Sequence, residues 1–276
     1  MKLSIWSSYY IDLKAEDAVK RFAEHGIDCS ELSDEHGFEL LSRNDDVHET
    51  ARKFADFLKE YHFEISQGHL WLKIKLCADD TALEKLFRWI DLYEEIGIKN
   101  MVLHCDNLSE TSFSREEKVK KNIEKLRLLA EYIKDKDITI CLENLRPHTP
   151  EETDLVDRSA DDLLYIIEQV GSSKFGICLD TGHLNLTDRN QREFILKAGD
   201  KLKALHIANN DGSADQHLMP FNRGTVNFPE VVQALKEINY RGVFNLEIPG
   251  ETGIPLALRD AKIEYIKACY QYLMNT

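Results

Sequence analysis

The chain has 276 residues, a formal net charge of −14 and 43% apolar residues. An acidic surface repels nucleic-acid phosphates, and no stretch approaches the roughly 20 consecutive apolar residues that span a bilayer, so nucleic-acid-binding and membrane proteins are disfavoured. The six cysteines show no CxxC pairing and the N-terminus does not resemble a signal peptide, which favours buried, reduced thiols in a cytoplasmic protein.

Short apolar runs rich in Ile, Leu and Val alternate with charged, amphipathic stretches along the whole chain. The runs are residues 2–6, 27–32, 63–69, 100–105, 138–144, 175–180, 202–208 and 243–248. The stretches between them carry helix signals, such as Ser114 at a start and Gly97 and Gly171 at ends. This alternation predicts a single (β/α)8 TIM-barrel domain over residues 1–276. A doubly wound open sheet is the alternative, but the Gly-x-Gly-x-x-Gly motif that commonly accompanies it is absent.

Four of the later runs carry a polar residue at or near their ends, namely Glu143, Asp180, His206 and Glu247. The carboxyl ends of barrel strands meet at one mouth, so strands five to eight would bring these residues together. Because ionisable groups are costly to bury alone, we expect them to share one divalent metal ion. Mn²⁺ is the leading candidate for this set of ligands, with Mg²⁺, Co²⁺ and Zn²⁺ as alternatives.

The same four residues suggest a reaction. A metal ion at the mouth would polarise a carbonyl group, and a carboxylate would then move a proton through a metal-bound enediolate. Glu143 and Glu247 are the candidates for this acid–base pair. Two working carboxylates would give epimerisation, and one dominant carboxylate would give an aldose–ketose shift.

A second set of polar residues is expected at the same mouth. His183 follows Asp180 by three residues, and the runs at 63–69 and 100–105 contain a histidine near their ends. The loops 144–159 and 208–227 follow two of the predicted ligands and are expected to contact substrate. Each of these polar residues also has a structural reading as a hydrogen-bonded or solvated side chain. The candidates for substrate binding are His69, His104, His183, Asp215, His217 and Arg223.

Several motifs resemble the sugar phosphate isomerase/epimerase family, the xylose isomerase-like barrels that include ketose 3-epimerases and inosose dehydratases. The motifs are LEN at 142–144, CLDTGH at 178–183, LHIANND at 205–211, the Asp-x-His at 215–217 and NLEIPG at 245–250. The resemblance implies that the four strand-end residues bind the metal, that their two glutamates exchange a proton with a sugar, and that His183 contacts substrate. The chain departs from the family pattern at Phe221, where the family often has the first glycine of a Pro-Gly-x-Gly turn.

The same barrel resembles the apurinic endonucleases, which hold three zinc ions with additional His and Asp ligands. Equivalents of those ligands are present at His69, His104, His183, Asp215 and His217. A zinc phosphodiesterase, a metal-dependent dehydratase or lyase, and a non-catalytic sugar-binding protein therefore remain alternatives to a sugar isomerase or epimerase. The expected partner is a small sugar or sugar phosphate, and a homo-oligomer is left open.

Overall fold

A computed structural model describes the chain from residue 1 to 276 except for residues 45, 110, 148, 150 and 151. Eight parallel strands form one sheet in the order β7-β6-β5-β4-β3-β2-β1-β8. The strands are β1 (Leu3–Trp6), β2 (Cys29–Leu32), β3 (Glu64–His69), β4 (Asn100–Leu103), β5 (Thr139–Glu143), β6 (Phe175–Asp180), β7 (Leu202–His206) and β8 (Phe244–Leu246). The helices are α1 (Ala15–Glu24), α2 (Asp34–Leu41), α3 (Val47–Glu60), α4 (Ala82–Ile96), α5 (Arg115–Ile133), α6 (Ala160–Val170), α7 (Thr181–Asn185), α8 (Gln191–Ala198), α9 (Phe228–Glu237) and α10 (Leu256–Asn275).

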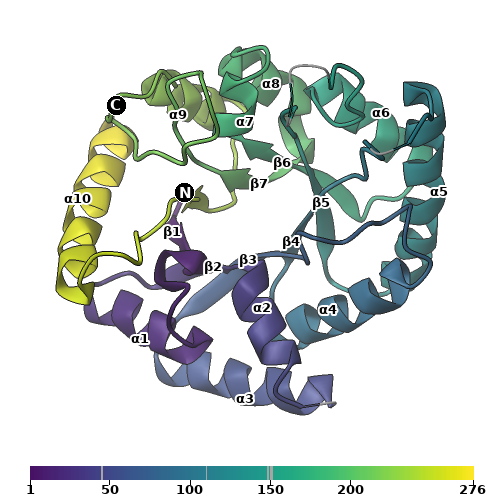
Figure 1. The fold of residues 1–276 in the computed structure, drawn as a ribbon. Coiled ribbons are helices and arrows are strands. Elements are labelled where there is room, and N and C mark those ends of the chain that lie inside the picture. Colours follow the sequence, from purple (N-terminus) through teal and green to yellow (C-terminus); the bar gives the residue numbers. More distant parts are fainter. Residues whose placement is uncertain (45, 110, 148, 150–151) are drawn as a thin grey trace.

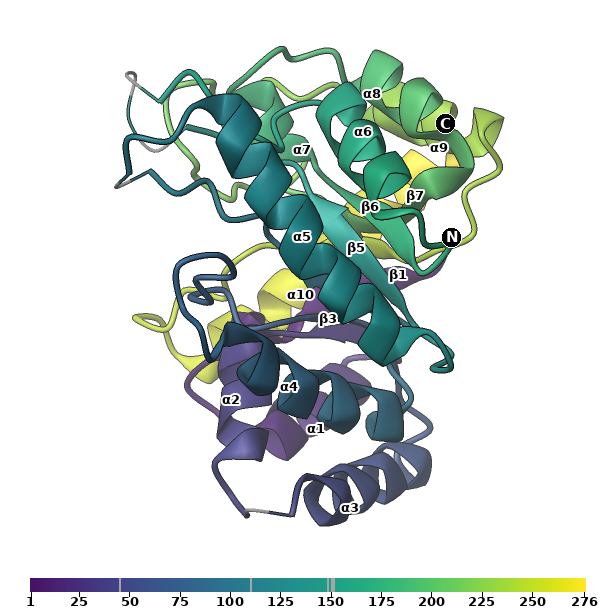
Figure 2. The same ribbon diagram turned by 90° about the vertical axis from the view of Figure 1, so that its right-hand side faces the viewer.

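The two edge strands of this sheet meet and close it into a barrel. The Ile207 amide donates to the Asn245 carbonyl at 2.8 Å, and the Glu247 amide donates to the Ile207 carbonyl at 3.1 Å. A parallel bridge also pairs Ile207 with Leu246. Most of the helices lie outside the strands and surround them (Figure 1, and from the side in Figure 2). The prediction of a (β/α)8 barrel is therefore confirmed.

The expected helix boundaries have clear local causes. Ser114 caps α5 through a reciprocal capping box with Glu117, which satisfies amides that the first helical turn leaves unpaired. Gly97 and Gly171 end α4 and α6 at φ values of 103° and 75°, a left-handed conformation that glycine adopts without steric cost. The signals in the sequence thus correspond to the observed helix ends.

Additional helices lie close to the carboxyl ends of the strands. The helix α2 begins directly after β2, where the Ser33 hydroxyl accepts from the His36 amide. The short helix α7 begins directly after β6, where Asp180 accepts from the His183 amide at 2.6 Å. In the predicted loop 144–159, residues 148, 150 and 151 lie outside the described residues, so the loop prediction applies only to the remainder.

The six cysteines are free thiols, and all but Cys77 are buried, as the sequence predicts. Among the described residues, no helix combines the length and the apolar character needed to cross a membrane.

Candidate active site

The four predicted metal ligands lie together at the carboxyl end of the barrel. Glu143, Asp180 and His206 are the last residues of β5, β6 and β7, and Glu247 directly follows β8. Ligand atoms of Asp180, His206 and Glu247 all lie within 4.8 Å of one another. Glu143 Oε2 is 3.2 Å from His206 Nδ1. All four are buried, so this group forms the floor of the mouth.

The floor contains buried polar atoms that lack hydrogen-bond partners among the described residues. These atoms are Asp180 Oδ2, His206 Nδ1 and Glu247 Oε2. An unsatisfied buried polar atom costs about 1–3 kcal/mol, and more when it is charged. Three carboxylates around one imidazole also leave an excess of negative charge. The donor set therefore fits a divalent cation with oxygen and nitrogen ligands.

The two glutamates of the floor have opposite electrostatic environments. Burial acts to raise the pKa of Glu143, but His206 and His104 outweigh it, and the pKa falls well below its usual range. Burial also raises the pKa of Glu247 to about 8; His206 and His217 act against this rise, but Asp180 and Glu143 add to it. Two carboxyl groups with separated pKa values are the arrangement expected of an acid and a base that share a task.

A buried glutamate that sequence reasoning missed supports the floor from below. Glu31, on β2, lies with Oε1 at 3.0 Å from His206 Nε2. Its other oxygen accepts from Gln67 at 3.0 Å and also from Asn245. When His206 Nε2–H donates to Glu31, the Nδ1 lone pair faces the carboxylates of Glu143 and Glu247. Metal-binding histidines commonly donate from their other ring nitrogen to a carboxylate in this way. The signal was available, since Glu31 lies near the end of an apolar run just as Glu143 does.

Two histidines extend the site on one side. His69 Nε2 and His104 Nε2 are 3.3 Å apart, and the two atoms lie 3.5 and 3.0 Å from Glu143 Oε2. Burial lowers the pKa of both, but Glu143 raises the pKa of His69 to about 9, whereas the pKa of His104 stays lowered. These two residues and Glu143 form a second group with the spacing of metal ligands.

The opposite rim is organised around Asp215. His183 Nε2 and Arg146 Nε each lie 3.2 Å from its Oδ2 atom, and His217 Nε2 lies 3.3 Å from its Oδ1 atom. Burial acts to raise the pKa of Asp215, but the two histidines lower it strongly, and Asp215 contributes to a pKa of about 10 for His217. His183 Nδ1 also lies 3.2 Å from Glu143 Oε1, which links this rim to the floor.

The structure places Arg223 apart from these residues. Its side chain is 67% exposed, and its Nε atom lies 4.0 Å from Asp211 Oδ2. The neighbouring Phe221 has a φ of 60°, a left-handed conformation that is strained for a bulky residue and that glycine adopts freely.

A pocket of about 340 Å³ opens above the floor. Its lining contains two further charged residues that the sequence did not single out: Arg146, from the loop after β5, and Asp34, at the start of α2. No local pattern distinguishes Arg146 from other loop residues. The lining residues are Trp6, Asp34, His69, Leu72, His104, Glu143, Leu145, Arg146, His183, Asp215, His217 and Glu247.

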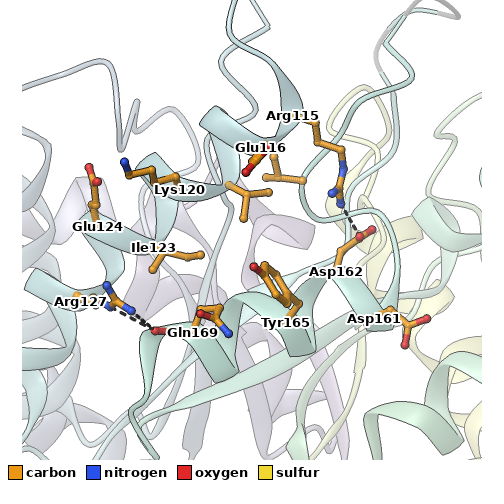
Figure 3. A pocket seen from close by; sticks show the side chains of 12 residues that line it. Arg115, Glu116, Lys120, Ile123, Glu124, Arg127, Asp161, Asp162, Tyr165 and Gln169 are labelled. Atoms are coloured by element: carbon orange, nitrogen blue, oxygen red, sulfur yellow. Dashed lines mark hydrogen bonds and ion pairs between the residues drawn. The ribbon is translucent and has the colours of Figure 1, made fainter.

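A larger groove of about 820 Å³ lies elsewhere, on the outer surface between α5 and α6. Figure 3 shows its mixed charges, including the contact between Arg115 and Asp162, and the hydrogen bonds from Arg127 to the Gln169 carbonyl. Its charged groups do not converge on a common point. The smaller pocket, which collects the ionisable groups, is therefore the candidate active site.

Comparisons with known proteins agree with the barrel fold. The chain is 25% identical to the L-ribulose 3-epimerase of Methylomonas sp. (strain DH-1) over 254 residues, which covers 88% of this chain and 81% of that protein. The fold matches D-psicose 3-epimerase from Clostridium cellulolyticum H10, solved with D-tagatose, with a TM-score of 0.81, 15% identity and 99% of both chains covered. It also matches a D-tagatose 3-epimerase-like protein with a TM-score of 0.77, 24% identity and coverage of 99% of this chain and 100% of that one. The xylose isomerase-like TIM barrel family matches residues 19–269, and the chain belongs to that family.

Proposed function

We propose that the protein is a divalent-metal-dependent epimerase or isomerase of a sugar or sugar phosphate. The observation that carries the proposal is the placement of two carboxylates around one imidazole atom. His206 Nδ1 lies 3.2 Å from Glu143 Oε2 and 3.5 Å from Glu247 Oε2, beneath a pocket large enough for a monosaccharide. The epimerases among the relatives support a sugar substrate.

Glu143, Asp180, His206 and Glu247 would hold the cation, for which Mn²⁺ is the leading candidate. Once bound, the cation would polarise the substrate carbonyl and acidify the neighbouring carbon-bound proton. Glu31 keeps the His206 ring oriented through its contact with Nε2. The buried floor would exclude bulk water from the reacting carbon.

The two glutamates would divide the proton transfer. One carboxylate takes the proton from the carbon next to the carbonyl group, and the other carboxyl group returns a proton to the opposite face, which inverts that carbon. The lowered pKa of Glu143 and the raised pKa of Glu247 fit the base and the acid in one direction of the reaction. On the rim, His183 and Arg146 line the pocket and would contact the hydroxyl groups of the sugar.

The test is deuterium exchange from solvent into a panel of ketoses and ketose phosphates in the presence of Mn²⁺. The wild-type protein should introduce deuterium at the carbon next to the carbonyl group, and Glu247→Gln should reduce the rate by about 10²–10⁴-fold. Glu116→Gln on the outer surface is the matched control and should exchange at the wild-type rate. Because Glu143 alone could still exchange a proton on its own face, the decisive readout is inversion: epimerisation at the wild-type rate by a folded Glu247→Gln variant would remove that glutamate from the mechanism.

A zinc phosphodiesterase is the second candidate, because the site also contains the two flanking groups. His69 and His104 surround Glu143 on one side, and His183 and His217 surround Asp215 on the other. Against this candidate, Arg146 is the only Arg or Lys that lines the pocket among the described residues, and the net charge is −14. Three zinc ions per chain together with cleavage of abasic DNA would favour the phosphodiesterase over the epimerase.

A further inference from the structure

Asn144 directly follows the predicted metal ligand Glu143 and is fully buried. It does not line the pocket above the floor, so it has no contact with the reacting carbon in the proposed proton transfer. A buried amide side chain has to place two donor hydrogens and one acceptor oxygen, so its hydrogen bonds show what it holds in place. Both polar atoms of the Asn144 side chain bond to the backbone of one residue, Asp180, at the end of the next strand.

These two hydrogen bonds form a backbone clamp on Asp180. The Asp180 amide donates to Asn144 Oδ1 at 2.8 Å, and Asn144 Nδ2 donates to the Asp180 carbonyl at 3.0 Å. Asn144 thus adjoins one predicted metal ligand in the chain and holds the backbone of another. The backbone clamp therefore fixes the position of Asp180 relative to Glu143.

The backbone clamp takes the place of the next hydrogen bonds in the β5–β6 ladder. Glu143 pairs with Cys178, and the Asn144 amide donates to the Cys178 carbonyl at 3.4 Å. If the parallel ladder continued, the Asp180 amide would donate to the Asn144 carbonyl. The Asn144 side chain accepts from that amide instead, so β5 can end here without leaving the buried backbone groups of Asp180 unpaired. The Asn144 carbonyl is then available to another donor.

That donor is the ring of His183. His183 Nδ1 lies 3.0 Å from the Asn144 carbonyl oxygen and 3.2 Å from Glu143 Oε1. Both neighbours are acceptors, so Nδ1 carries a hydrogen, and Nε2 is the atom that faces Asp215 Oδ2 at 3.2 Å. Asn144 therefore contacts a residue of the floor through its side chain and a residue of the rim through its carbonyl.

We propose that Asn144 is a positioning residue that fixes Asp180 as a metal ligand and keeps His183 directed towards the rim. Asp180 Oδ1 accepts from the His183 amide at 2.6 Å, whereas Oδ2 has no hydrogen-bond partner among the described residues. With its backbone held by Asn144 and its Oδ1 atom held by α7, Asp180 has Oδ2 left for a cation. This inference rests on the proposed metal site and adds the residue that sets its geometry.

Asn122 on α5 makes the same kind of backbone clamp away from the pocket. It is also fully buried, its Oδ1 atom accepts from the Asp106 amide at 2.8 Å, and its Nδ2 atom donates to the Asp106 carbonyl at 2.9 Å. Neither Asn122 nor Asp106 lines the pocket. Since Asn122 Nδ2 also donates to the Lys118 carbonyl, its loss should destabilise the fold at least as much as the loss of Asn144. The two asparagines therefore allow a general loss of stability to be separated from a loss of positioning.

The test compares Asn144→Ala with Asn122→Ala by denaturant unfolding of the metal-free proteins and by Mn²⁺ titration followed by electron paramagnetic resonance. Both variants should unfold at a lower denaturant concentration than the wild-type protein, because each leaves a backbone amide and a backbone carbonyl unpaired. Only Asn144→Ala should bind Mn²⁺ more weakly, by about 10–100-fold, which is the loss typical of residues that orient metal ligands. At saturating Mn²⁺ its KM for the sugar should stay raised, because the Asp180 amide would compete with His183 for the carbonyl of residue 144.

Asn144→Ser is the second variant in case Asn144→Ala folds poorly, since its hydroxyl group can bind water in the space of the amide, and it should show the same selective loss of Mn²⁺ affinity. Wild-type affinity in a folded Asn144 variant would overturn the inference and leave the metal site intact. An equal loss of affinity in Asn122→Ala would overturn it too, because Asn122 holds no predicted ligand. A wild-type protein that binds no Mn²⁺ would instead refute the metal site itself, and with it the role of Asn144.

Discussion

The floor and the Asp215 rim of the pocket are both rich in acids and histidines, but they differ in how their charge is balanced. On the rim, Asp215 lies within 3.3 Å of the cation Arg146 and of two histidines. On the floor, the carboxylates of Glu143, Asp180 and Glu247 gather around His206, and three floor atoms lack hydrogen-bond partners among the described residues. Asp215 Oδ1 and Arg146 Nε on the rim lack such partners too, so the difference lies in charge: the rim pairs its one carboxylate with an arginine, whereas the floor has three carboxylates and no Arg or Lys, and therefore fits an added cation better.

The largest expected effect comes from removing a floor carboxylate, that of Asp180, whose Oδ2 atom has no hydrogen-bond partner among the described residues. In Asp180→Asn, divalent-cation affinity should fall by more than 100-fold, which exceeds the loss typical of second-sphere changes. The amide oxygen can still cap α7, so the metal-free variant should be at least as stable as the metal-free wild type. Thermal unfolding with and without Mn²⁺ separates the two effects. Equal stabilisation of both proteins by Mn²⁺ would show that Asp180 is not a ligand.

A smaller loss of affinity is expected when the support of the floor is changed. Glu31→Gln leaves one acceptor oxygen where Glu31 has two, so an NH2 group must face either His206 or the amide donors of Gln67 and Asn245. In the first orientation His206 loses the acceptor that orients it, and we expect Mn²⁺ affinity to fall about 10–100-fold. In the second orientation the buried donors lose their acceptor, at a cost of about 1–3 kcal/mol of stability. Titration with Mn²⁺ followed by electron paramagnetic resonance measures the affinity. Unchanged affinity together with unchanged stability would mean that the orientation of His206 does not depend on Glu31.

A substitution on the rim should weaken sugar binding and leave cation binding unchanged. Asp215→Asn should raise KM for the sugar by about tenfold, since His183 and Arg146 lose the carboxylate that positions them. Cation affinity and the number of bound ions should not change. Steady-state kinetics and metal analysis of the same preparation provide both values. Loss of a bound ion in this variant would instead make Asp215 a metal ligand and favour the phosphodiesterase.

Asp157 is a buried carboxyl group outside the pocket, and its effect on the stability of the protein should depend on pH. Burial raises the pKa of Asp157 to about 7, and its Oδ2 atom lacks a hydrogen-bond partner among the described residues. A carboxyl pKa raised by folding means that the native state binds the extra proton, so this group reduces stability as pH rises from about 4 to about 7. Asp157→Asn should therefore stabilise the protein at pH 8 by on the order of 1–3 kcal/mol and have little effect near pH 4. Denaturant unfolding at the two pH values measures the difference, and an equal effect at both would contradict this explanation.

The smallest effect is expected at Arg223, which lies outside the pocket lining and is 67% exposed. Arg223→Ala should change kcat and KM by less than about twofold, in line with the weak contribution of exposed charges. A tenfold rise in KM would return this residue to the substrate site.

The strands and the floor were predictable from the sequence for the same physical reason. Buried parallel strands are continuous apolar runs, so a polar residue near the end of such a run, as at Glu143 or His206, stands out. Glu31 has the same signal and was missed because its run also contains the polar residues Asp28 and Ser30. The assignment of one domain to residues 1–276 stays a prediction.

The rim was harder to derive because loop geometry has no periodic signal. Arg146 lies three residues after Glu143, but nothing in the sequence shows that its side chain turns towards Asp215. Arg223 is also a loop arginine near a predicted ligand, and the structure directs it outward. Likewise, the short helices α2 and α7 begin at polar caps directly after strands, where a loop and a helix start look alike in sequence.

The number of divalent ions bound per chain tests the central claim most directly. Metal analysis of protein dialysed against Mn²⁺ should find one ion per wild-type chain and almost none in Asp180→Asn, with both proteins folded. A folded wild-type protein that binds no divalent cation would contradict the account, because the negative charge of the floor would then have to be balanced by protons alone.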